Sequence, residues 1–203
     1  LHVVPPGRSM DYAFSLRDAN LGNDRVLQQW YAMNRAGSLK ELQTSVHTLQ
    51  GIPWVNTLAA DRGGRAMYAD VSVVPDVDAA QLARCGPGQP AAALRQAAGL
   101  VVLNGSRADC AWHRDSTSPV PGLIPIGRMP VAVRSDWVHN SNDSFVYTHP
   151  DQKFEGISPL VGDDSLTRPR TRAGLAEMPD VLGRGTVTLE AIQGQLFGTC
   201  NFM

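Results

Sequence analysis

The sequence is poor in the features that assign a protein to a class at first sight. Aromatic residues make up 6% and charged residues 18% of the chain, and the formal net charge is -1. A nearly neutral chain with scattered basic residues predicts no strong attraction to nucleic acid or to an anionic membrane surface. No apolar run approaches the length of a membrane span, and the first residues lack the charged start and apolar core of a signal peptide. We therefore expect neither a nucleic-acid partner nor a membrane partner.

The common self-contained catalytic motifs are missing as well. There is no Gly-x-Ser-x-Gly elbow, no glycine-rich phosphate loop and no His-Glu-x-x-His sequence. The histidines are dispersed along the chain, and no spacing of cysteine and histidine is typical of zinc (His2, His47, His113, His139, His149). His47 is interpreted as a structural or surface residue. The residues alone predict no metal site and no cofactor, and they make an independent serine hydrolase a weak alternative.

Cysteine is scarce, with three residues at 85, 110 and 200. Cys85 and Cys110 flank a segment rich in glycine, alanine and proline. A disulfide between them would close a loop of about 25 residues, stabilise the fold by roughly 3 kcal/mol and imply an oxidising compartment. The alternative is that all three cysteines are buried thiols. Composition leaves both open.

The hydrophobic content of 43% supports a sizeable core, and the patterns predict a mixed α+β chain. Helices are expected at about 24–35, at 38–49 behind a capping box of Ser38 and Glu41, from 175 onward and at 186–197. Residues 54–60 and 65–74 predict a β-hairpin around Arg62-Gly-Gly64. Short strands are expected at 11–16, 101–103 and 130–133, and loops with at most a short helix at 75–95, 115–130 and 151–172.

The pattern also predicts which faces of two elements are buried. The apolar residues of 26–33 predict a buried helical stripe. The strand from Trp54 to Ala60 is apolar at nearly every position, so we expect it to be buried on both faces, with Asn56 as a buried amide that needs partners.

The most informative stretch is polar and runs from Trp137 to Phe145, directly after the strand at 130–133. It concentrates short amide and hydroxyl side chains, which favour turns and local hydrogen bonds to the backbone. Further on, Arg168, Arg170 and Arg172 alternate with other residues. A solvated turn and a solvated basic edge are the simple explanations for these two segments.

Taken in order, several motifs resemble the β-subunit of the penicillin acylase family. They are Asp18-Ala-Asn20 with Asn23 and Arg25, Gln29-Trp30, residues 51–57, Ala60-Asp-Arg62, Tyr68-Ala-Asp70, residues 140–144 and residues 170–175. The similarity extends from about residue 11 to residue 198 and is greatest to the acyl-homoserine lactone and aculeacin acylases. It implies that residues 1–203 form a single region, an interior part of an acylase β-subunit. The implied fold is the N-terminal-nucleophile (Ntn) hydrolase αββα sandwich, with antiparallel sheets between layers of helices.

The resemblance also implies a mechanism and assigns residues to it. Such enzymes attack an amide with the hydroxyl of an N-terminal serine, whose own amino group is the base, and they form an acyl-enzyme. An asparagine amide helps to hold the oxyanion, and Asn142 is the first candidate, with Asn140 second. Arg170, or else Arg172, would orient that asparagine or the amine of the serine. The aromatic residues Trp137 and Phe145 are candidates for the substrate pocket, as is Trp54, with core packing as the alternative.

The family's nucleophile, its nearby histidine and the backbone oxyanion donor are expected upstream of Leu1, so this chain is interpreted as processed or excised. None of Gly37-Ser38, Gly105-Ser106 and Gly198-Thr199 precedes the expected strand of a self-cleavage junction. The expected partners are an α-subunit, the remainder of the β-subunit and a small N-acyl substrate with a medium or long acyl chain. That substrate is an acyl-homoserine lactone, a lipopeptide or a β-lactam. Family members are made as precursors and exported, which implies a periplasmic or secreted protein. They need no cofactor, although some relatives hold a structural calcium. The alternative function is an inactive fragment or degenerate relative that only binds.

Overall fold

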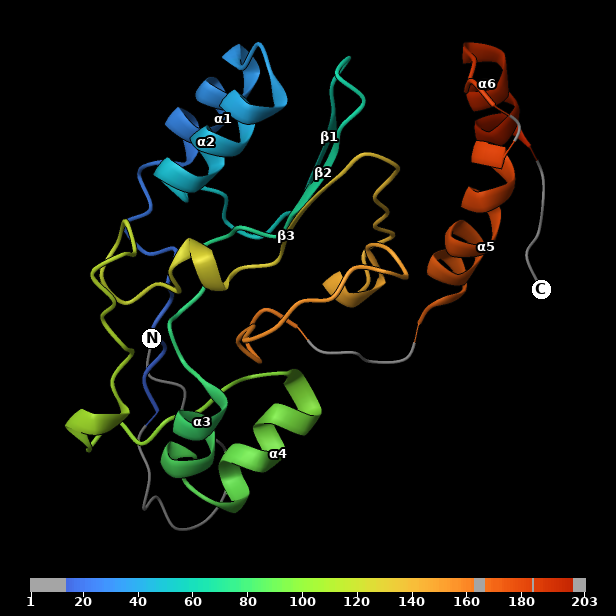
Figure 1. Ribbon diagram of the computed structural model, residues 1–203. Coiled ribbons are helices and arrows are strands. Elements are labelled where there is room, and N and C mark those ends of the chain that lie inside the picture. The colour runs from blue at the N-terminus through green and yellow to red at the C-terminus, as the bar shows by residue number, and fades with distance from the viewer. Residues whose placement is uncertain (1–13, 163–166, 184, 199–203) are drawn as a thin grey trace.

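The computed structural model describes residues 14–162, 167–183 and 185–198. Residues 11–13 of the strand expected at 11–16, together with Thr199 and Cys200, lie outside these residues. The predicted α+β class is confirmed by helices around one small sheet (Figure 1). The elements are α1 (Val26–Arg35), α2 (Leu39–Leu49), β1 (Thr57–Ala60), β2 (Ala66–Ala69), α3 (Ala79–Cys85), α4 (Gln89–Ala98), β3 (Val131–Arg134), α5 (Pro169–Gly183) and α6 (Leu189–Phe197).

The sheet contains three antiparallel strands in the order β1-β2-β3. In the predicted hairpin Thr57 pairs with Ala69, and in the second pair of strands Ala69 pairs with Val131. The hairpin turn is closed by a backbone hydrogen bond from the Asp61 N–H to the Arg65 carbonyl. The side chains of these two residues also form an ion pair at 2.9 Å. Gly64 sits in the turn at φ +75, a left-handed conformation that suits glycine. Both the hairpin and the strand after Pro130 are therefore confirmed.

Alternation along β2 and the residues that follow it separates two environments. Met67, Ala69 and Val71 are buried in the main core. There they join residues from α2 and from the loops beside the sheet (Leu39, Val46, Ile52, Ile124, Met129). Tyr68 points to the opposite face and packs with Ala132 and Phe145 in a second cluster. Because side chains alternate in extended chain, Asp70 and Ser72 follow Tyr68 to that second face.

The expected capping box of α2 is present, except that the Glu41 side chain bonds to the N–H of Gly37 and not to that of Ser38. Ser38 Oγ accepts the Glu41 N–H at 3.2 Å, and the Glu41 carboxylate accepts the N–H of Gly37 at 2.8 Å. The helix ends at Gln50 in a left-handed conformation, and the Gln50 amide donates to the Ile124 carbonyl at 2.9 Å. A side chain on Gly51 would meet the Arg25 carbonyl, since a Cβ there would lie 2.8 Å from that oxygen. The α1–α2 pair is thus held closely against the start of the hairpin.

The apolar stripe predicted for α1 is confirmed only in part, because Val26 and Met33 are half-buried and Met33 packs against the main core. The buried residue of α1 is Gln29, whose side-chain oxygen accepts the Gly51 N–H at 3.1 Å. Leu27 and Tyr31 are exposed, at 79% and 63%. The contact between Gln29 and Gly51 sets the rotation of the helix, so a polar link between two chain segments overrides the apolar pattern.

Three further expectations need correction. Residues 101–103 form no strand, and the residue after them, Asn104, donates its N–H to the Cys85 carbonyl. The run from Trp54 to Ala60 is not buried on both faces, because β1 is an edge strand on which Leu58 is 46% exposed. Helix α5 begins at Pro169, within the passage expected to be irregular.

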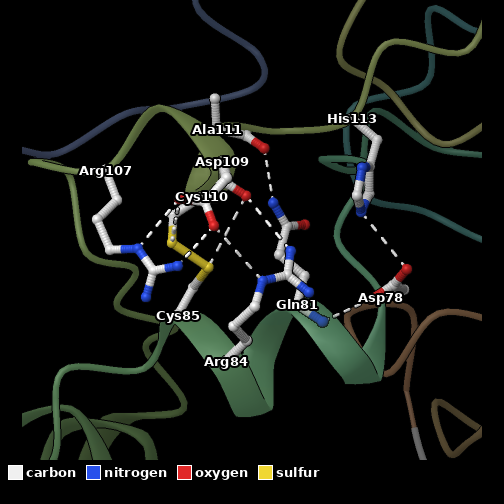
Figure 2. A network of polar contacts seen from close by, with 9 residues as sticks. All are labelled: Asp78, Gln81, Arg84, Cys85, Arg107, Asp109, Cys110, Ala111 and His113. Atoms are coloured by element: carbon white, nitrogen blue, oxygen red, sulfur yellow. Dashed lines mark hydrogen bonds and ion pairs between the residues drawn. A yellow bond between two sulfur atoms is a disulfide. The ribbon is translucent and has the colours of Figure 1, made fainter.

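The disulfide expectation is supported, since the sulfur atoms of Cys85 and Cys110 lie 2.10 Å apart, at bonding distance. Figure 2 shows the polar contacts around this pair. Arg84 and Arg107 both contact the Asp109 carboxylate, and the Gln81 amide donates to the Ala111 carbonyl at 2.6 Å. These contacts fasten α3 to the segment before Trp112. None of the described helices is both long enough and apolar enough to cross a membrane.

Candidate functional site

The polar stretch after β3 is a turn built by asparagine side chains. Asn140 Oδ1 accepts the backbone N–H of Asn142 at 2.9 Å, and its Nδ2 donates to the Asp143 carbonyl at 3.1 Å. The same Asn140 oxygen accepts a hydrogen bond from Asn56 at 3.1 Å, which links the turn to the hairpin. Asn56, expected to be a buried amide, is half-buried and also accepts from the Tyr68 hydroxyl at 3.4 Å. The Asn140 oxygen therefore accepts two hydrogen bonds, and one of the two N–H donors of its amide is also used in holding the turn.

Asn142 is held differently. Its φ of 61 places it in the left-handed region, which asparagine tolerates better than most residues. Its Oδ1 accepts hydrogen bonds from both terminal nitrogens of Arg170, each at 3.3 Å. Within the described part of the chain, its Nδ2 has no partner, and Asn142 lines a cavity. An arginine only donates hydrogen bonds, so the atom that faces it must be the amide oxygen, and Nδ2 is left available.

Asp143 fastens the turn to the start of α5. Its Oδ2 accepts hydrogen bonds from the Thr171 hydroxyl at 2.5 Å and from the Arg168 backbone N–H at 2.8 Å. The Thr171 hydroxyl first, and then the Arg168 N–H, hold the pKa of Asp143 below its usual range. A carboxylate at this position satisfies an unpaired N–H and complements the positive end of the helix dipole. Pro169 at the first helical position has no N–H to satisfy.

One face of α5 meets the turn. Arg170, Thr171 and Gly174 share this face, because residues three and four apart lie together on a helix. A Cβ on Gly174 would overlap the imidazole ring of His139. Arg172 lies about 200° around the helix from Arg170 and is exposed. The geometry therefore joins Arg170, and not Arg172, to Asn142.

A cavity of about 480 Å³ lies between the turn and the hairpin. Its lining is mixed, with Pro53, Trp54, Asn56, Asp70, Ser72, Val74, Asn142, Asp143, Ser144, Phe145, Leu160, Val161, Gly162 and Arg168. Trp54 is 80% exposed, whereas Phe145 is buried and packs edge-on against Phe154. Trp137 is not part of this lining and lies against His149, with ring centroids 4.2 Å apart. Of the predicted pocket aromatics, the structure brings Phe145 and Trp54 together and leaves Trp137 elsewhere.

Asp70, which belongs to the Tyr68-Ala-Asp70 motif but was assigned no role from the sequence, also lines this cavity. Burial raises the pKa of Asp70 to about 6. The signal that could have found it is the alternation Tyr68, Asp70, Ser72, which carries a carboxylate onto a partly enclosed face. A polar residue in a strand pattern is usually assigned to solvent, so the alternation alone did not reveal the cavity.

Ser141 and His139 also come together, with Ser141 Oγ 2.8 Å from His139 Nε2. Burial lowers the pKa of His139, while a backbone hydrogen bond with Tyr147 and the charge of Asp143 act in the opposite direction. A serine–histidine pair needs an acceptor behind the ring to orient it and to stabilise its charged form. The nearby Asp143 is instead engaged by α5, so this contact packs the turn. No group of three metal-ligating side chains is gathered in the described part of the chain.

Comparison with known proteins identifies the chain. A family model described as penicillin amidase matches residues 3–199. The chain belongs to the penicillin amidase family. It is 46% identical over 183 residues to an acyl-homoserine lactone acylase PvdQ of Pseudomonas fluorescens, covering 90% of this chain. It is 40% identical over 167 residues to the aculeacin-A acylase of Actinoplanes utahensis, covering 82% of this chain. The matched region spans 23% and 21% of the lengths of those two proteins.

Membership of the penicillin amidase family gives the turn at 140–144 a context. The turn is pinned at Asn140, Asn142 and Asp143 and borders a cavity, and Asn142 itself is exposed, as the alternative of a solvated turn expects. Both relatives are acylases by name.

Proposed function

We propose that this chain is part of an amide hydrolase that removes an acyl group from N-acyl substrates, and that Asn142 supplies an oxyanion donor. Asn142 Nδ2 donates a hydrogen bond to the oxygen of the tetrahedral intermediate. A primary amide suits this role because it donates without carrying charge and does not titrate. Arg170 holds Oδ1 and so fixes which end of the amide faces the cavity. The paired 3.3 Å contacts between Arg170 and Asn142 are the observation that carries the assignment.

The nucleophile in this proposal is the N-terminal serine of a self-cleaved precursor and lies outside the 203 residues. Its hydroxyl oxygen attacks the amide carbonyl while its α-amino group takes the proton. The C–N bond then breaks, the amine leaves with that proton, and water hydrolyses the acyl ester to release the acid. An α-subunit and the rest of the β-subunit complete the site within an Ntn αββα sandwich. The small antiparallel sheet and the family membership support this fold.

The proposed substrates are acyl-homoserine lactones or lipopeptides with a medium or long acyl chain. The names of the relatives support this choice, and β-lactams stay a less favoured class. Trp54 and Phe145 form part of the acyl pocket, because both line the cavity that Asn142 borders. We propose a periplasmic or secreted protein, since a disulfide between Cys85 and Cys110 persists in an oxidising compartment.

The test uses protein produced from its whole coding sequence. N-terminal sequencing should find one chain that begins with serine, and chromatography should detect acid released from a series of acyl-homoserine lactones and phenylacetyl amides. Asn142→Ala should lower kcat about 10²- to 10³-fold with little change in KM, as expected for one lost oxyanion donor.

Asn104→Ala is the matched control, because Asn104 Oδ1 likewise accepts a backbone N–H two residues on, from Ser106 at 3.1 Å, but does not line the cavity. Its kcat should equal that of the wild type. A larger loss in Asn140→Ala than in Asn142→Ala would move the assignment to Asn140. A preference for phenylacetyl amides would overturn the proposed acyl chain, and the absence of a chain with N-terminal serine would favour the binding-only alternative.

A further inference from the structure

Asp70 is a carboxylate that the proposed mechanism does not use. It is the first residue after β2 and lines the same cavity as Asn142, together with Ser72 and Val74 from the following residues. These three share one face because side chains alternate along extended chain. The opposite face, with Ala69 and Val71, is buried in the main core. The backbone therefore fixes the direction in which the Asp70 side chain leaves the sheet.

The other carboxylates near the sheet are paired. Asp76 is buried, and both of its oxygens lie 2.7 Å from Arg128. Asp143 is held by Thr171 and Arg168, and Asp61 by Arg65. The carboxylate of Asp70 has no hydrogen bond or ion pair within the described residues. Arg168 lines the same cavity but contacts Asp143 and the Asn142 carbonyl.

An enclosed carboxylate without a partner is unfavourable, because burial removes water from the charged form. Raising the pKa of Asp70 to about 6 is the expected response. At neutral pH the group is therefore mostly ionised and still lacks a donor. Such a group in a cavity of small-molecule size is a candidate for contact with a ligand.

The neighbours of Asp70 indicate which part of a ligand it meets. Trp54, Phe145 and Leu160 contribute apolar side chains to the walls of the cavity, although most of its exposed lining is polar. A carboxylate among such walls discriminates strongly for a hydrogen-bond donor, since a ligand without one leaves the charge unpaired.

We propose that Asp70 is a specificity-determining residue that accepts a hydrogen bond from a hydroxyl or a protonated amine on the acyl group held in the cavity. For the identity of the ligand, this inference rests on the proposed function. It adds a preference for acyl groups that carry a donor over unsubstituted chains of equal length.

The experiment measures equilibrium binding of free carboxylic acids by calorimetry at pH 7.5, again with protein produced from its whole coding sequence. The acids share one chain length and are unsubstituted, monohydroxylated or aminated, with the substituent moved along the chain. Wild type should bind the best donor-bearing acid at least about 10-fold more tightly than the unsubstituted one. Asp70→Leu, which removes charge and acceptor, should abolish that ratio.

Two further variants distinguish the sources of the effect. Asp70→Asn keeps an acceptor without charge, so it should retain part of the preference for a hydroxyl and lose the preference for an amine. Asp61→Asn removes a carboxylate from the turn of the same hairpin, outside the cavity lining, and should keep the wild-type ratio. An unchanged ratio in Asp70→Leu at every position of the substituent overturns the inference. The absence of binding by every acid, or a loss of stability in Asp70→Asn with no change in the ratio, also overturns it.

The calorimetric measurement of binding does not depend on catalysis, so it tests Asp70 separately from the proposed function. If the protein binds donor-bearing acids through Asp70 but hydrolyses no amide, the proposed function fails and the assignment of Asp70 stands. If it hydrolyses amides and Asp70→Leu leaves the ratio of kcat/KM for matched amides unchanged, the assignment of Asp70 fails and the function stands.

Discussion

Both terminal nitrogens of Arg170 lie 3.3 Å from Oδ1 of Asn142, across a separation of 28 residues. Because Arg170 donates hydrogen bonds to the amide oxygen, it orients the Asn142 amide without contacting the substrate. Arg170→Ala should therefore lower kcat about 10-fold while KM stays nearly constant, a smaller loss than in Asn142→Ala. The kcat of Arg170→Lys should lie between those of wild type and Arg170→Ala, since an ammonium keeps the charge but not the planar fork.

A double variant tests whether Arg170 acts through Asn142. Arg170→Ala added to Asn142→Ala should cost no further turnover, because the residue that Arg170 positions is already gone. Steady-state kinetics on the four proteins give the answer. Arg172→Ala is the matched control and should have the kcat of the wild type. Additive losses in the double variant, or a larger loss in Arg172→Ala than in Arg170→Ala, would contradict the positioning role.

Asp143 is expected to stabilise the junction between the turn and α5. Asp143→Asn keeps the shape but weakens the hydrogen bonds to Thr171 and to the Arg168 N–H, so the melting temperature should fall by roughly 2–4 °C at pH 7. The pKa of Asp143 is depressed in the folded state. Its contribution is therefore present above the unfolded pKa of about 3.9 and is lost as pH falls through the folded pKa.

Thermal melting at pH 7 and at pH 3 tests this relation. The difference between wild type and Asp143→Asn should shrink at pH 3, because this pH is below the unfolded pKa and the contribution of the carboxylate declines there. Thr171→Val removes only the hydroxyl and should reproduce part of the loss at pH 7. Equal melting temperatures for wild type and Asp143→Asn at pH 7 would show that the junction does not depend on this carboxylate.

Asp70 should have the opposite dependence on pH. Burial raises its folded pKa to about 6 from an ordinary value of 3.8, so the folded state binds the proton more tightly. Stability from this group is fully present below about pH 4 and is lost as pH rises through 6. Asp70→Asn should therefore stabilise the protein by about 2 kcal/mol at pH 7.5 and have little effect at pH 4.

Urea denaturation at the two pH values measures this effect. Asp61→Asn is the control with the reverse sign, because the side-chain hydrogen bond from Arg65 lowers the pKa of Asp61. It should be slightly less stable than wild type at pH 7.5. If Asp70→Asn is destabilised at pH 7.5, Asp70 has a cationic partner in the complete protein.

Local sequence signals predicted much of the fold because the structures involved are local. Gly63 and Gly64 mark the hairpin, and Ser38 and Thr188 cap α2 and α6 through their own side chains. The start of α5 was missed for the complementary reason. Its N-terminal N–H is satisfied by Asp143, 25 residues earlier in the chain, so no capping residue stands beside it.

In the candidate site, too, the features set by local sequence were predicted and those set by tertiary contacts were not. The sequence identified the polar turn and the arginines and placed Asn142 before Asn140, but it offered no structural reason for that order, since both are asparagines two residues apart. The choice depends on tertiary contacts, with Asn140 bound to Asn56 and Asn142 bound to Arg170. The exposure of Leu58 likewise depends on β1 being an edge strand, which composition does not encode.

The pairing of Cys85 with Cys110 predicts a labelling pattern. Alkylation of the unfolded, unreduced chain should modify one cysteine, and alkylation after reduction should modify three. The Cys85→Ser/Cys110→Ser variant should lose about 3 kcal/mol of unfolding free energy, since the disulfide closes a loop with a sequence separation of 25. Cys200→Ser should instead remove the single label of the unreduced chain. Three labels before reduction would show that the two thiols are free.

Two glycines of α5 give a matched pair for testing the packing of the helix against the turn. A Cβ on Gly174 would overlap the His139 ring, whereas a Cβ on Gly183 would meet nothing within 4 Å. Gly183→Ala should stabilise the protein by up to about 1 kcal/mol, since alanine favours helix. Gly174→Ala gains the same helix propensity but must displace His139 and with it the contact to Ser141, so it should destabilise by about 1–3 kcal/mol.

The two variants should also differ in activity. Displacing His139 disturbs the turn that carries Asn142, so Gly174→Ala should lower kcat as well as stability, while Gly183→Ala should leave kcat unchanged. Urea denaturation and steady-state kinetics on the same preparations separate the two effects. If Gly174→Ala were as stable and as active as Gly183→Ala, the close approach of α5 to His139 could not be what positions the turn.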